Sequence, residues 1–407
     1  MSPQAVLDRL YAYTDFARRR TASYTAKHYH LDGMRALLAA LGNPEARLRI
    51  VHVAGTKGKG STCHYLARLL TESGEKTGLY TSPQVFDERD RIRVGGRPLS
   101  WAEFTRLFEA CERAARRAKL RPTVFEFFTA MALVHFKACG VSFAVMETGL
   151  GGRLDSTNVL SPELCLITPI DFDHMDKLGD TLDAIASEKA GIIKRGIPVL
   201  TSPQRPAAAR VIRQKAERER APLTIVSEND AGLLPPALPS PRYQDGNRAL
   251  ALAAFRRLGG ELGPRAAHRV LSSPVAGRYQ RLGRYLLDGA HNPFAVERLV
   301  DSVKRDPHLR GRRVAVVFFC LSDKPLKKML GLFPRTWARH YFDLDLAWAP
   351  GNRAANLAAL GGGKGRPPVL ADWKAVEAVS RVHDITLLTG SFSLVSHALR
   401  ELQWPLV

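Results

Sequence analysis

The sequence predicts an α/β protein with a P-loop-type, mostly parallel sheet domain followed by a smaller, Rossmann-like α/β domain. Three observations lead to this prediction. A β-branched run at 48–53 passes through a glycine-rich joint into a helical pattern that begins at Ser61. Strand and helix patterns then alternate, which is typical of parallel sheets. A fresh strand–helix series starts after Pro274, so we expect domains at 1–273 and 274–407.

The composition indicates a large folded chain with acidic partners. Its 407 residues are 45% hydrophobic, which is enough to bury two cores. Sixty Lys and Arg against 39 Asp and Glu give a net charge of +21. That excess points to nucleotides, polyanionic substrates or nucleic acid. The basic residues are spread along the chain, so most of them are expected on solvated faces.

The same composition predicts a cytoplasmic protein. The five cysteines form no CxxC pair, which is typical of reduced thiols. The N-terminus has no apolar signal core, and the longest apolar run, 314–321, is too short to cross a bilayer. We therefore expect no membrane partner.

Periodicity places the elements of the first domain. Ser100 and Glu103 form a capping box, and Pro122 ends the helix that they begin. The charged segment 86–99 contains Gly95-Gly96 and is predicted to be a loop, and 231–241 holds four prolines and is predicted to be a connector. The pattern further predicts helices at 3–19, 31–41, 100–120, 124–138, 180–190, 206–220 and 247–258, and strands at 48–53, 77–81, 141–146, 164–168 and 198–201.

The second domain repeats the alternation over a shorter length. The pattern predicts strands at 284–287, 313–319, 340–344 and 385–389, and helices at 293–305, 324–332, 371–380 and 391–402. The glycine cluster 361–365 contains a lysine but follows no nearby strand. It is therefore predicted to be a surface turn.

The glycine-rich joint after 48–53 is a candidate phosphate loop. Glycine lets the backbone approach a phosphate, and the N–H groups of the helix N-terminus point at the anion. Lys59 can reach the β- and γ-phosphates, and the Ser61 hydroxyl can bind Mg²⁺. The usual P-loop spacing would place a glycine at Val53, whereas this chain has Gly55. A glycine-rich turn that merely carries a lysine is the alternative.

Polar residues near the predicted strand ends suggest a metal site beside this loop. Glu147 follows the strand 141–146, and His174 follows 164–168. With Ser61 they supply oxygen and nitrogen ligands for a divalent cation beside phosphate. Parallel strands bring their carboxyl ends to one ligand crevice. Singly, Glu147 could be a helix cap and His174 a hydrogen-bonded core histidine.

The second domain offers a matching joint after its first predicted strand. Asp288 ends the strand, His291 follows, and Pro293 suits the first turn of a helix. The Asp and His could hold a ribose or a phosphate. A cap cluster around Asn292 is the alternative.

A series of motifs runs in order from about residue 24 to residue 396. The motifs are Gly55-Thr56-Lys57-Gly58-Lys59-Gly60-Ser61, Thr81-Ser82-Pro83, Phe125-Glu126-Phe127-Phe128-Thr129-Ala130, Glu147 to Asn158, Asp173-His174, Leu178-Gly179, Glu188 to Lys194, Gly277-Arg278, Asp288 to Pro293, Asp323-Lys324 and Thr389-Gly390-Ser391. In this combination the chain resembles the dihydrofolate synthase/folylpolyglutamate synthase family of the Mur-ligase superfamily.

The resemblance implies an ATP-dependent ligase. It would add L-glutamate to dihydropteroate or reduced folates through an acyl phosphate, releasing ADP and phosphate. The implied cofactors are ATP and two Mg²⁺ ions, with K⁺ as a candidate further ion. The implied partners are L-glutamate and the folate-type substrate, and a monomer is expected.

The resemblance also assigns roles by position. Catalysis would rest on Lys59, His174 and Lys189, with Lys189 carbamylated. The metal ligands would be Ser82, Glu147, His174 and Lys189. The nucleotide would be bound by Gly55, Thr56, Gly58, Lys59, Gly60, Ser61, Thr62, Asn247, Arg278, Asp288 and His291.

Three departures from the family pattern concern the substrates. Lys57 stands where the family usually has Asn, which adds a charge beside the phosphates, and Asp90-Arg91-Ile92 replaces Glu-Arg-Ile. The segment between Gln204 and Tyr243 is shorter than usual, which affects contacts on the pterin side.

Two other functions stay open. One is a related Mur-type amide ligase acting on another carboxylate, such as a peptidoglycan precursor. The other is a P-loop nucleic-acid-binding ATPase, suggested by the charge. No nucleic-acid module or aromatic-rich basic stripe is visible, so nucleic acid is not the expected partner.

Overall fold

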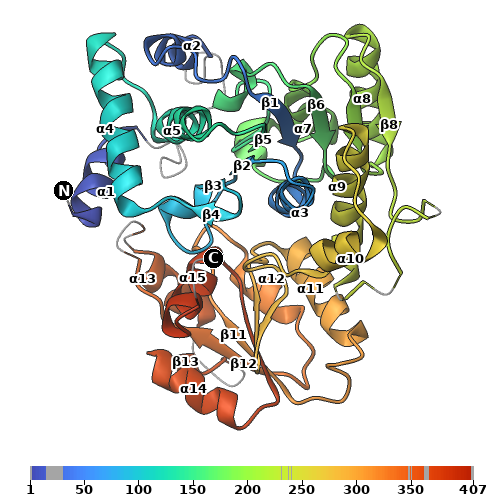
Figure 1. The fold of residues 1–407 in the computed structure, drawn as a ribbon. Coiled ribbons are helices and arrows are strands. Elements are labelled where there is room, and N and C mark those ends of the chain that lie inside the picture. Colours follow the sequence, from blue (N-terminus) through green and yellow to red (C-terminus); the bar gives the residue numbers. More distant parts are fainter. Residues whose placement is uncertain are drawn as a thin grey trace.

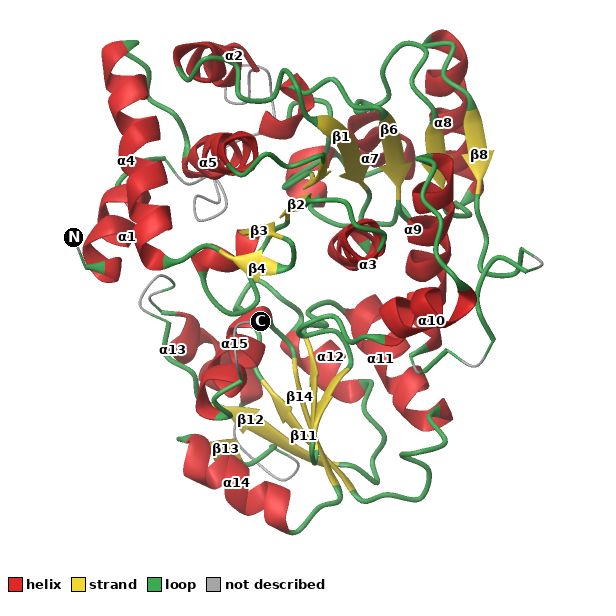
Figure 2. Ribbon diagram, in the orientation of Figure 1, coloured by secondary structure: helices red, strands yellow, loops and turns green. Residues whose placement is uncertain are grey.

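The protein folds around two sheets that lie one above the other (Figure 1). The structure, a computed structural model, describes residues 2–14, 31–230, 232–236, 238–239, 241–346, 349, 351–361 and 366–404. We call residues 2–273 the N-terminal unit and residues 274–404 the C-terminal unit. Figure 2 shows helices around both sheets. The predicted α/β class, with a larger mostly parallel sheet and a smaller one, is confirmed.

The N-terminal unit is built on eight strands in the order β4-β3-β2-β5-β1-β6-β7-β8. The neighbouring strands β2, β5, β1, β6, β7 and β8 pair in parallel. Strand β3 pairs antiparallel with both β2 and β4. The strands are β1 (Arg49–Ala54), β2 (Thr77–Tyr80), β3 (Ile92–Val94), β4 (Arg97–Pro98), β5 (Phe143–Glu147), β6 (Leu164–Ile167), β7 (Val199–Thr201) and β8 (Leu223–Ile225).

Helices cover both faces of this sheet because successive strand side chains point to opposite sides. Val51 and Val53 of β1 share a core with α3 (Lys59–Glu72), α9 (Asp245–Arg257) and α10 (Pro264–Ser272). Ile50 points the other way. Its face is covered by α1 (Pro3–Tyr11), α2 (Leu31–Ala40), α4 (Trp101–Arg117) and α5 (Val124–Ala138), and beside β6 and β7 by α7 (Leu182–Ala190) and α8 (Pro206–Arg218). Short helical turns η1 (Glu88–Arg91), η2 (Ser156–Val159), α6 (Met175–Leu178) and η3 (Arg242–Gln244) lie between them.

The C-terminal unit has six strands in the order β13-β12-β11-β14-β10-β9 around one core. All its pairings are parallel except that of β9 with β10. Its strands are β9 (Gln280–Leu282), β10 (Tyr285–Asp288), β11 (Val314–Phe318), β12 (Ala338–Phe342), β13 (Val369–Leu370) and β14 (Ile385–Thr389). Its helices are α11 (Pro293–Arg305), α12 (Leu326–Gly331), α13 (Asn352–Leu360), α14 (Trp373–Arg381) and α15 (Phe392–Glu401).

The predicted loop at 86–99 is wrong. It contains η1 and the hairpin of β3 and β4, which continues the sheet beyond β2. Gly95 and Gly96 both have positive φ and form the hairpin turn. Strands of two and three residues are too short to show an alternating pattern in the sequence.

Other elements differ in extent or were missed. The first helix ends at Tyr11 rather than at residue 19, with Ala12 as its C-cap, and the predicted positions 15–19 lie outside the described residues. The elements that were not predicted include the edge strands β8, β9 and β13 and the helices α10 and α13. The glycine cluster at 362–365 also lies outside the described residues. No described helix is both long and apolar enough to cross a lipid bilayer.

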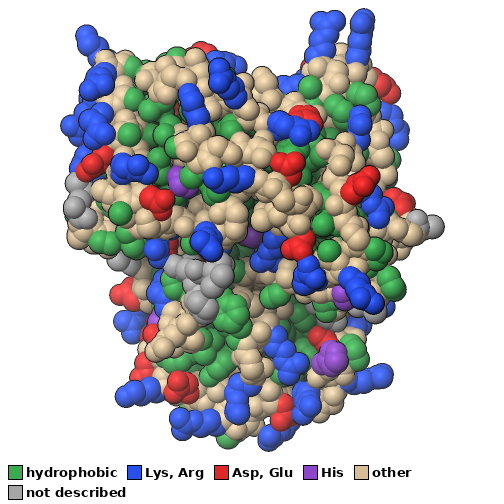
Figure 3. Space-filling view, viewed as in Figure 1, with side chains coloured by type: hydrophobic (Ala, Val, Ile, Leu, Met, Phe, Trp, Pro, Cys, Tyr) green, Lys and Arg blue, Asp and Glu red, His purple; other side chains and the backbone are tan. Residues whose placement is uncertain are grey.

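On the face shown in Figure 3, basic side chains are distributed rather than concentrated. Figure 3 shows Lys and Arg scattered over both halves of the face in view, with fewer acidic side chains between them. This agrees with the expectation that most of the +21 charge lies on solvated faces.

Candidate active site between the two sheets

A cavity of about 2360 Å³ lies between the two units. Its N-terminal wall comes from segments that follow β1, β2, β5 and β6, and its C-terminal wall from segments that follow β10, β11, β12 and β14. The carboxyl ends of both sheets therefore face one another across the cavity, the usual location of ligands in parallel α/β sheets.

The phosphate loop is shaped by two glycines that leave no room for a Cβ unless a neighbour shifts. Gly58 caps α3 with φ of 87°, and a Cβ there would lie 2.0 Å from Asn247 Oδ1. Gly55 has φ of 146°, and its Cβ would lie 1.9 Å from Thr168 Oγ1. Val53 is buried inside β1, which runs on to Ala54. Strand β1 therefore ends directly before Gly55, where the chain turns into the loop.

The loop is fixed to the segment that follows β6. The backbone N–H groups of Thr56 and Lys57 donate to the Pro169 carbonyl, at 3.1 and 3.2 Å. The Thr56 hydroxyl donates to the Asp171 carbonyl and accepts from the Asp171 N–H, both at 3.1 Å. Asp173 and His174 continue from this segment, so the loop and His174 are held in one rigid frame.

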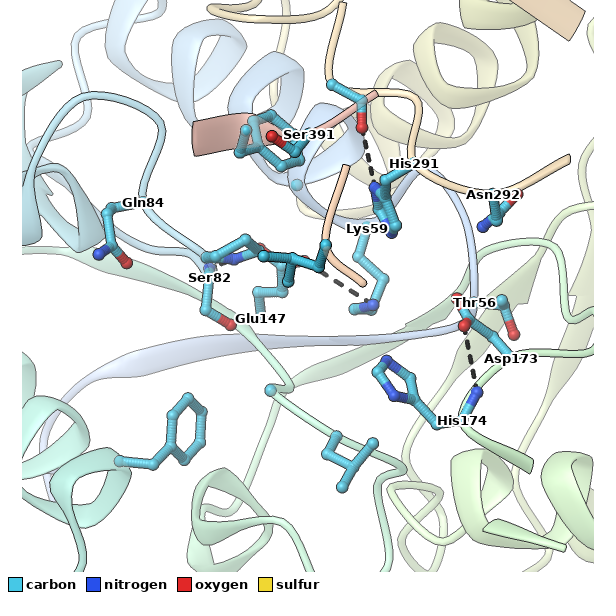
Figure 4. A pocket seen from close by; sticks show the side chains of 18 of the residues that line it. Thr56, Lys59, Ser82, Gln84, Glu147, Asp173, His174, His291, Asn292 and Ser391 are labelled. Atoms are coloured by element: carbon cyan, nitrogen blue, oxygen red, sulfur yellow. Dashed lines mark hydrogen bonds and ion pairs between the residues drawn. The ribbon is translucent and has the colours of Figure 1, made fainter. Parts of the chain in front are cut away.

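Lys59 and Glu147 face one another at the floor of the cavity (Figure 4). Lys59 Nζ lies 4.0 Å from Glu147 Oε1, and the Ser82 N–H donates to Glu147 Oε2 at 3.0 Å. Burial raises the pKa of the Glu147 carboxyl, and the nearby Lys59 ammonium acts against that rise. A further cation at this carboxylate would therefore stabilise its ionised form.

Lys189 is a buried amine behind the phosphate loop. Its Nζ donates to the Gly55 carbonyl at 2.9 Å, and its side chain comes from α7. Burial, followed by repulsion from Lys59, lowers the pKa of Lys189 to about 7. The neutral amine is thus readily available near neutral pH.

His174 lies opposite Glu147 in the same space. Its backbone is left-handed, with φ of 49°, and its N–H donates to Asp173 Oδ1 at 3.1 Å. Burial lowers the pKa of the imidazole, although Asp173 opposes this. A neutral ring nitrogen is the form that binds a metal ion or accepts a proton.

On the opposite wall, hydrogen bonds hold the carboxylate of Asp288 in place. Its Oδ2 accepts from the Tyr279 N–H at 2.9 Å and from the Tyr243 hydroxyl at 2.7 Å, and its Oδ1 accepts from the Ala290 N–H at 2.9 Å. Burial raises the pKa of this carboxyl, and Arg278 opposes the rise. Three residues on, His291 Nδ1 lies 2.8 Å from the Gly289 carbonyl oxygen, and burial lowers the pKa of His291 to about 4.

The predicted metal ligands fit Mg²⁺ held partly by a nucleotide better than a metal held by protein alone. Among the described residues, no group of three His, Cys, Asp or Glu side chains could hold a metal ion. Glu147 nevertheless adjoins the helix start, since a Cβ on Gly60 would lie 3.4 Å from Glu147 Oε2. Mg²⁺ commonly takes one or two carboxylates and completes its shell with water and phosphate oxygens.

Comparison with known proteins agrees with this geometry. A model of the Mur ligase middle domain matches residues 53–231. The dihydrofolate synthase/folylpolyglutamate synthase of Bacillus subtilis is 34% identical over 412 residues, covering 92% of this chain and 95% of the relative. The chain belongs to this family. The Escherichia coli relative of the same name is also 34% identical, covering 91% of this chain and 90% of the relative.

Solved structures of family members have the same fold over nearly the whole chain. Folylpolyglutamate synthase from Thermotoga maritima has a TM-score of 0.84 at 27% identity, covering 99% of this chain and 97% of that chain. E. coli FolC in complex with DHPP and ADP has a TM-score of 0.82 at 28% identity, covering 98% of this chain and 97% of that chain. The predicted family, fold class and ligase class are thereby confirmed.

Nearly all the predicted site residues of this family member line the one cavity. These are Thr56, Gly58, Lys59, Gly60, Ser61, Ser82, Glu147, His174, Lys189, Asn247, Arg278, Asp288 and His291. Gly55 and Thr62 lie behind the lining, where the Gly55 carbonyl holds Lys189 and the Thr62 side chain is buried. The individual roles stay predictions, but the structure brings both walls together as expected.

Sequence reasoning missed two polar groups of the cavity. Tyr243, from η3, donates to Asp288 of the other unit. Tyr11 donates to Glu88 Oε1 at 2.8 Å, Gln84 donates to the same oxygen at 3.2 Å, and Arg91 donates to Gln84 Oε1 at 2.9 Å. Only the dense charge of 86–99 hinted at the second group.

Proposed function

We propose that the protein is an ATP-dependent ligase that joins L-glutamate to the carboxylate of dihydropteroate or a reduced folate. One observation carries the proposal. Lys59 of the phosphate loop and the Asp288–His291 segment face one cavity from opposite units, so that a single nucleotide can contact both. Family membership supplies the glutamate and the folate-type acceptor. We retain the division into domains at 1–273 and 274–407 as part of this proposal.

The chemistry divides into two displacements. An acceptor carboxylate oxygen attacks the γ-phosphorus of ATP and ADP leaves, giving an acyl phosphate. The glutamate amine then attacks the acyl carbon, phosphate leaves, and the nitrogen loses a proton. Lys59 and the N–H groups that begin α3 would stabilise the charge on the phosphoryl oxygens. The walls of the cavity would keep water from the acyl phosphate.

Two Mg²⁺ ions are part of the proposal. Bound Mg²⁺ would neutralise charge on the transferring phosphoryl group. Glu147, Ser82, His174 and a modified Lys189 would hold these ions. All four line the cavity, and Figure 4 shows Ser82, Glu147 and His174 around Lys59. The K⁺ ion, the monomeric state and the cytoplasmic location stay predictions.

Lys189 is proposed to carry a carbamate. The neutral amine would add to CO₂ and lose one proton, leaving an anionic carbamate. Its lowered pKa, about 7, supplies the neutral amine. The carbamate nitrogen keeps one N–H, so the bond to the Gly55 carbonyl can persist while the new oxygens reach a hard cation.

The direct test is ADP release with three acceptors, each with and without L-glutamate. We expect dihydropteroate or tetrahydrofolate to stimulate release, and glutamate to sustain it. A response to a muramyl precursor alone would indicate the related Mur-type ligase. Stimulation by DNA or RNA, with no response to a pteroate plus glutamate, would indicate the ATPase instead.

A further inference from the structure

The phosphate loop makes a contact to the C-terminal unit that the proposed reaction has not used. Lys57 Nζ donates to Asn292 Oδ1 at 3.2 Å. The same ammonium lies 4.1 Å from the ring centroid of Phe294. The sequence predicted that this extra charge would lie beside the phosphates. The side chain crosses to the start of α11 and lines the cavity together with Asn292 and Phe294.

The contact is built on the helix cap of α11. Asn292 is the N-cap, and its Oδ1 also accepts the Ala295 N–H at 2.9 Å. One amide oxygen therefore caps the helix and accepts the lysine from the other unit, which its two lone pairs allow. The position is unusual because a helix N-terminus is electropositive and by itself repels an ammonium. The amide oxygen and the negative face of the Phe294 ring offset that repulsion.

Both ends of the contact belong to segments that are tied to their own unit. On the loop side, the Lys57 backbone N–H donates to Pro169. On the other side, Phe294 lies in the first turn of α11, whose Val296 and Leu299 belong to the core of the C-terminal unit. Lys57 is half-buried, and burial lowers the pKa of its ammonium although Asp173 and Asp171 oppose this. Such a contact can transmit the position of one unit to the other.

We propose that Lys57 is a positioning residue that couples the phosphate loop to the C-terminal unit through Asn292 and Phe294. We call these three residues the Lys57 bridge. The bridge favours the arrangement in which both walls can contact one nucleotide. Only the effect of the bridge on the KM for ATP rests on the proposed ATP-dependent reaction.

The kinetic consequence is an effect on nucleotide affinity rather than on the chemical step. If Lys57→Met lowers the population of the arrangement that binds ATP, the KM for ATP rises by the same factor. A lost cation–π contact and a lost charged hydrogen bond should raise KM about tenfold. The value of kcat at saturating ATP should change less than about twofold, because the bridge lies outside the reacting groups.

Phe294 offers a matched comparison because two cations contact its ring. Arg298 lies 5.3 Å from the ring centroid, but it belongs to α11 itself, so its contact joins no units. Arg298→Met should leave KM within about twofold. Phe294→Leu should raise KM, and the double variant Lys57→Met/Phe294→Leu should be no worse than Lys57→Met alone, since both remove one bridge.

A second measurement needs no turnover. Spin labels at Arg213→Cys in α8 and Lys374→Cys in α14, with Cys139→Ser, report the distance between the units in the ligand-free protein; both label sites are exposed. We expect Lys57→Met to widen the distance distribution and Arg298→Met to leave it unchanged. An unchanged distribution in Lys57→Met, or KM effects of Lys57→Met and Phe294→Leu that multiply, would overturn the bridge and indicate direct anion binding by Lys57. If the wild type turns over no ATP, the proposed function fails, whereas the distances still decide the bridge.

Discussion

Lys59 begins α3, and its ammonium points into the cavity while its side chain takes no part in a core. Lys59→Ala should therefore nearly abolish turnover, with kcat/KM falling about 10²–10³-fold, because removal of one transition-state charge partner typically costs that much. Thermal unfolding should stay close to that of the wild type. Near-normal turnover by the folded variant would remove Lys59 from the phosphate site.

The lowered pKa of Lys189 predicts how stability depends on pH. The folded pKa is about 7 against an ordinary value of 10.5. Between these values the unfolded chain binds more protons, so stability should rise with pH at about 1.4 kcal/mol per unit. The loss of stability caused by burying the charged Lys189 is complete below about pH 7 and absent above pH 10.5.

This dependence is measured by urea unfolding of the wild type and of Lys189→Met in CO₂-free buffer. The free energy of unfolding of the wild type relative to the variant should increase from pH 7 to pH 10. A difference that is flat across this range would mean that Lys189 is not desolvated as the structure indicates.

At the same scale, the sequence predicted the site residues that stand beside a local pattern, such as a strand–helix joint or the end of an apolar run. Lys59 and Asp288 stand at strand–helix joints, and Glu147 ends a buried run, so each could be found from its neighbours. Tyr243 could not, because its partner Asp288 is 45 positions away. Tyr11 and Glu88 are 77 positions apart, and their contact depends on how α1 packs beside η1. Such pairs follow from tertiary packing, which no local pattern encodes.

At the scale of elements, the turn into α3 depends on a glycine that the surrounding structure requires for two separate reasons. Gly58 combines a left-handed backbone with a close approach to Asn247 of α9. Gly74 has a similar φ of 96°, but a Cβ there meets nothing within 4 Å. Both Gly58→Ala and Gly74→Ala should lose about 1–2 kcal/mol of stability through backbone strain. Only Gly58→Ala should also lose ATP binding.

The comparison is made by calorimetric titration with a non-hydrolysable ATP analogue, after chemical unfolding of both variants. Equal analogue affinity in the two variants would show that the α3–α9 contact does not shape the nucleotide site.

Long elements were predictable, whereas short edge elements were not. The runs that became β1, β5 and β11 are buried on both sides and stand out as apolar stretches. Strands β3, β4, β9 and β13 have two or three residues at or near sheet edges and show no period. The turn at Gly95-Gly96 was visible in the sequence, but both glycines suit a loop as well as a hairpin.

At the scale of the whole molecule, the cavity of about 2360 Å³ leaves room for the units to approach once substrates fill it. We expect an ATP analogue together with the acceptor to reduce the radius of gyration, because each wall contributes part of the nucleotide site. Small-angle scattering with the analogue alone, the acceptor alone and both separates the contributions. An unchanged radius with both ligands bound would argue for a rigid molecule.

The central claim is that ATP activates an acceptor carboxylate as an acyl phosphate. The measurement that tests it most directly uses dihydropteroate labelled with ¹⁸O in its carboxylate, turned over with ATP and L-glutamate. The account predicts that each ADP formed is accompanied by one phosphate that carries a single ¹⁸O, because the attacking oxygen leaves with the phosphoryl group. Unlabelled phosphate released at the full rate of ADP formation would contradict the account, since water rather than the acceptor would then have attacked ATP.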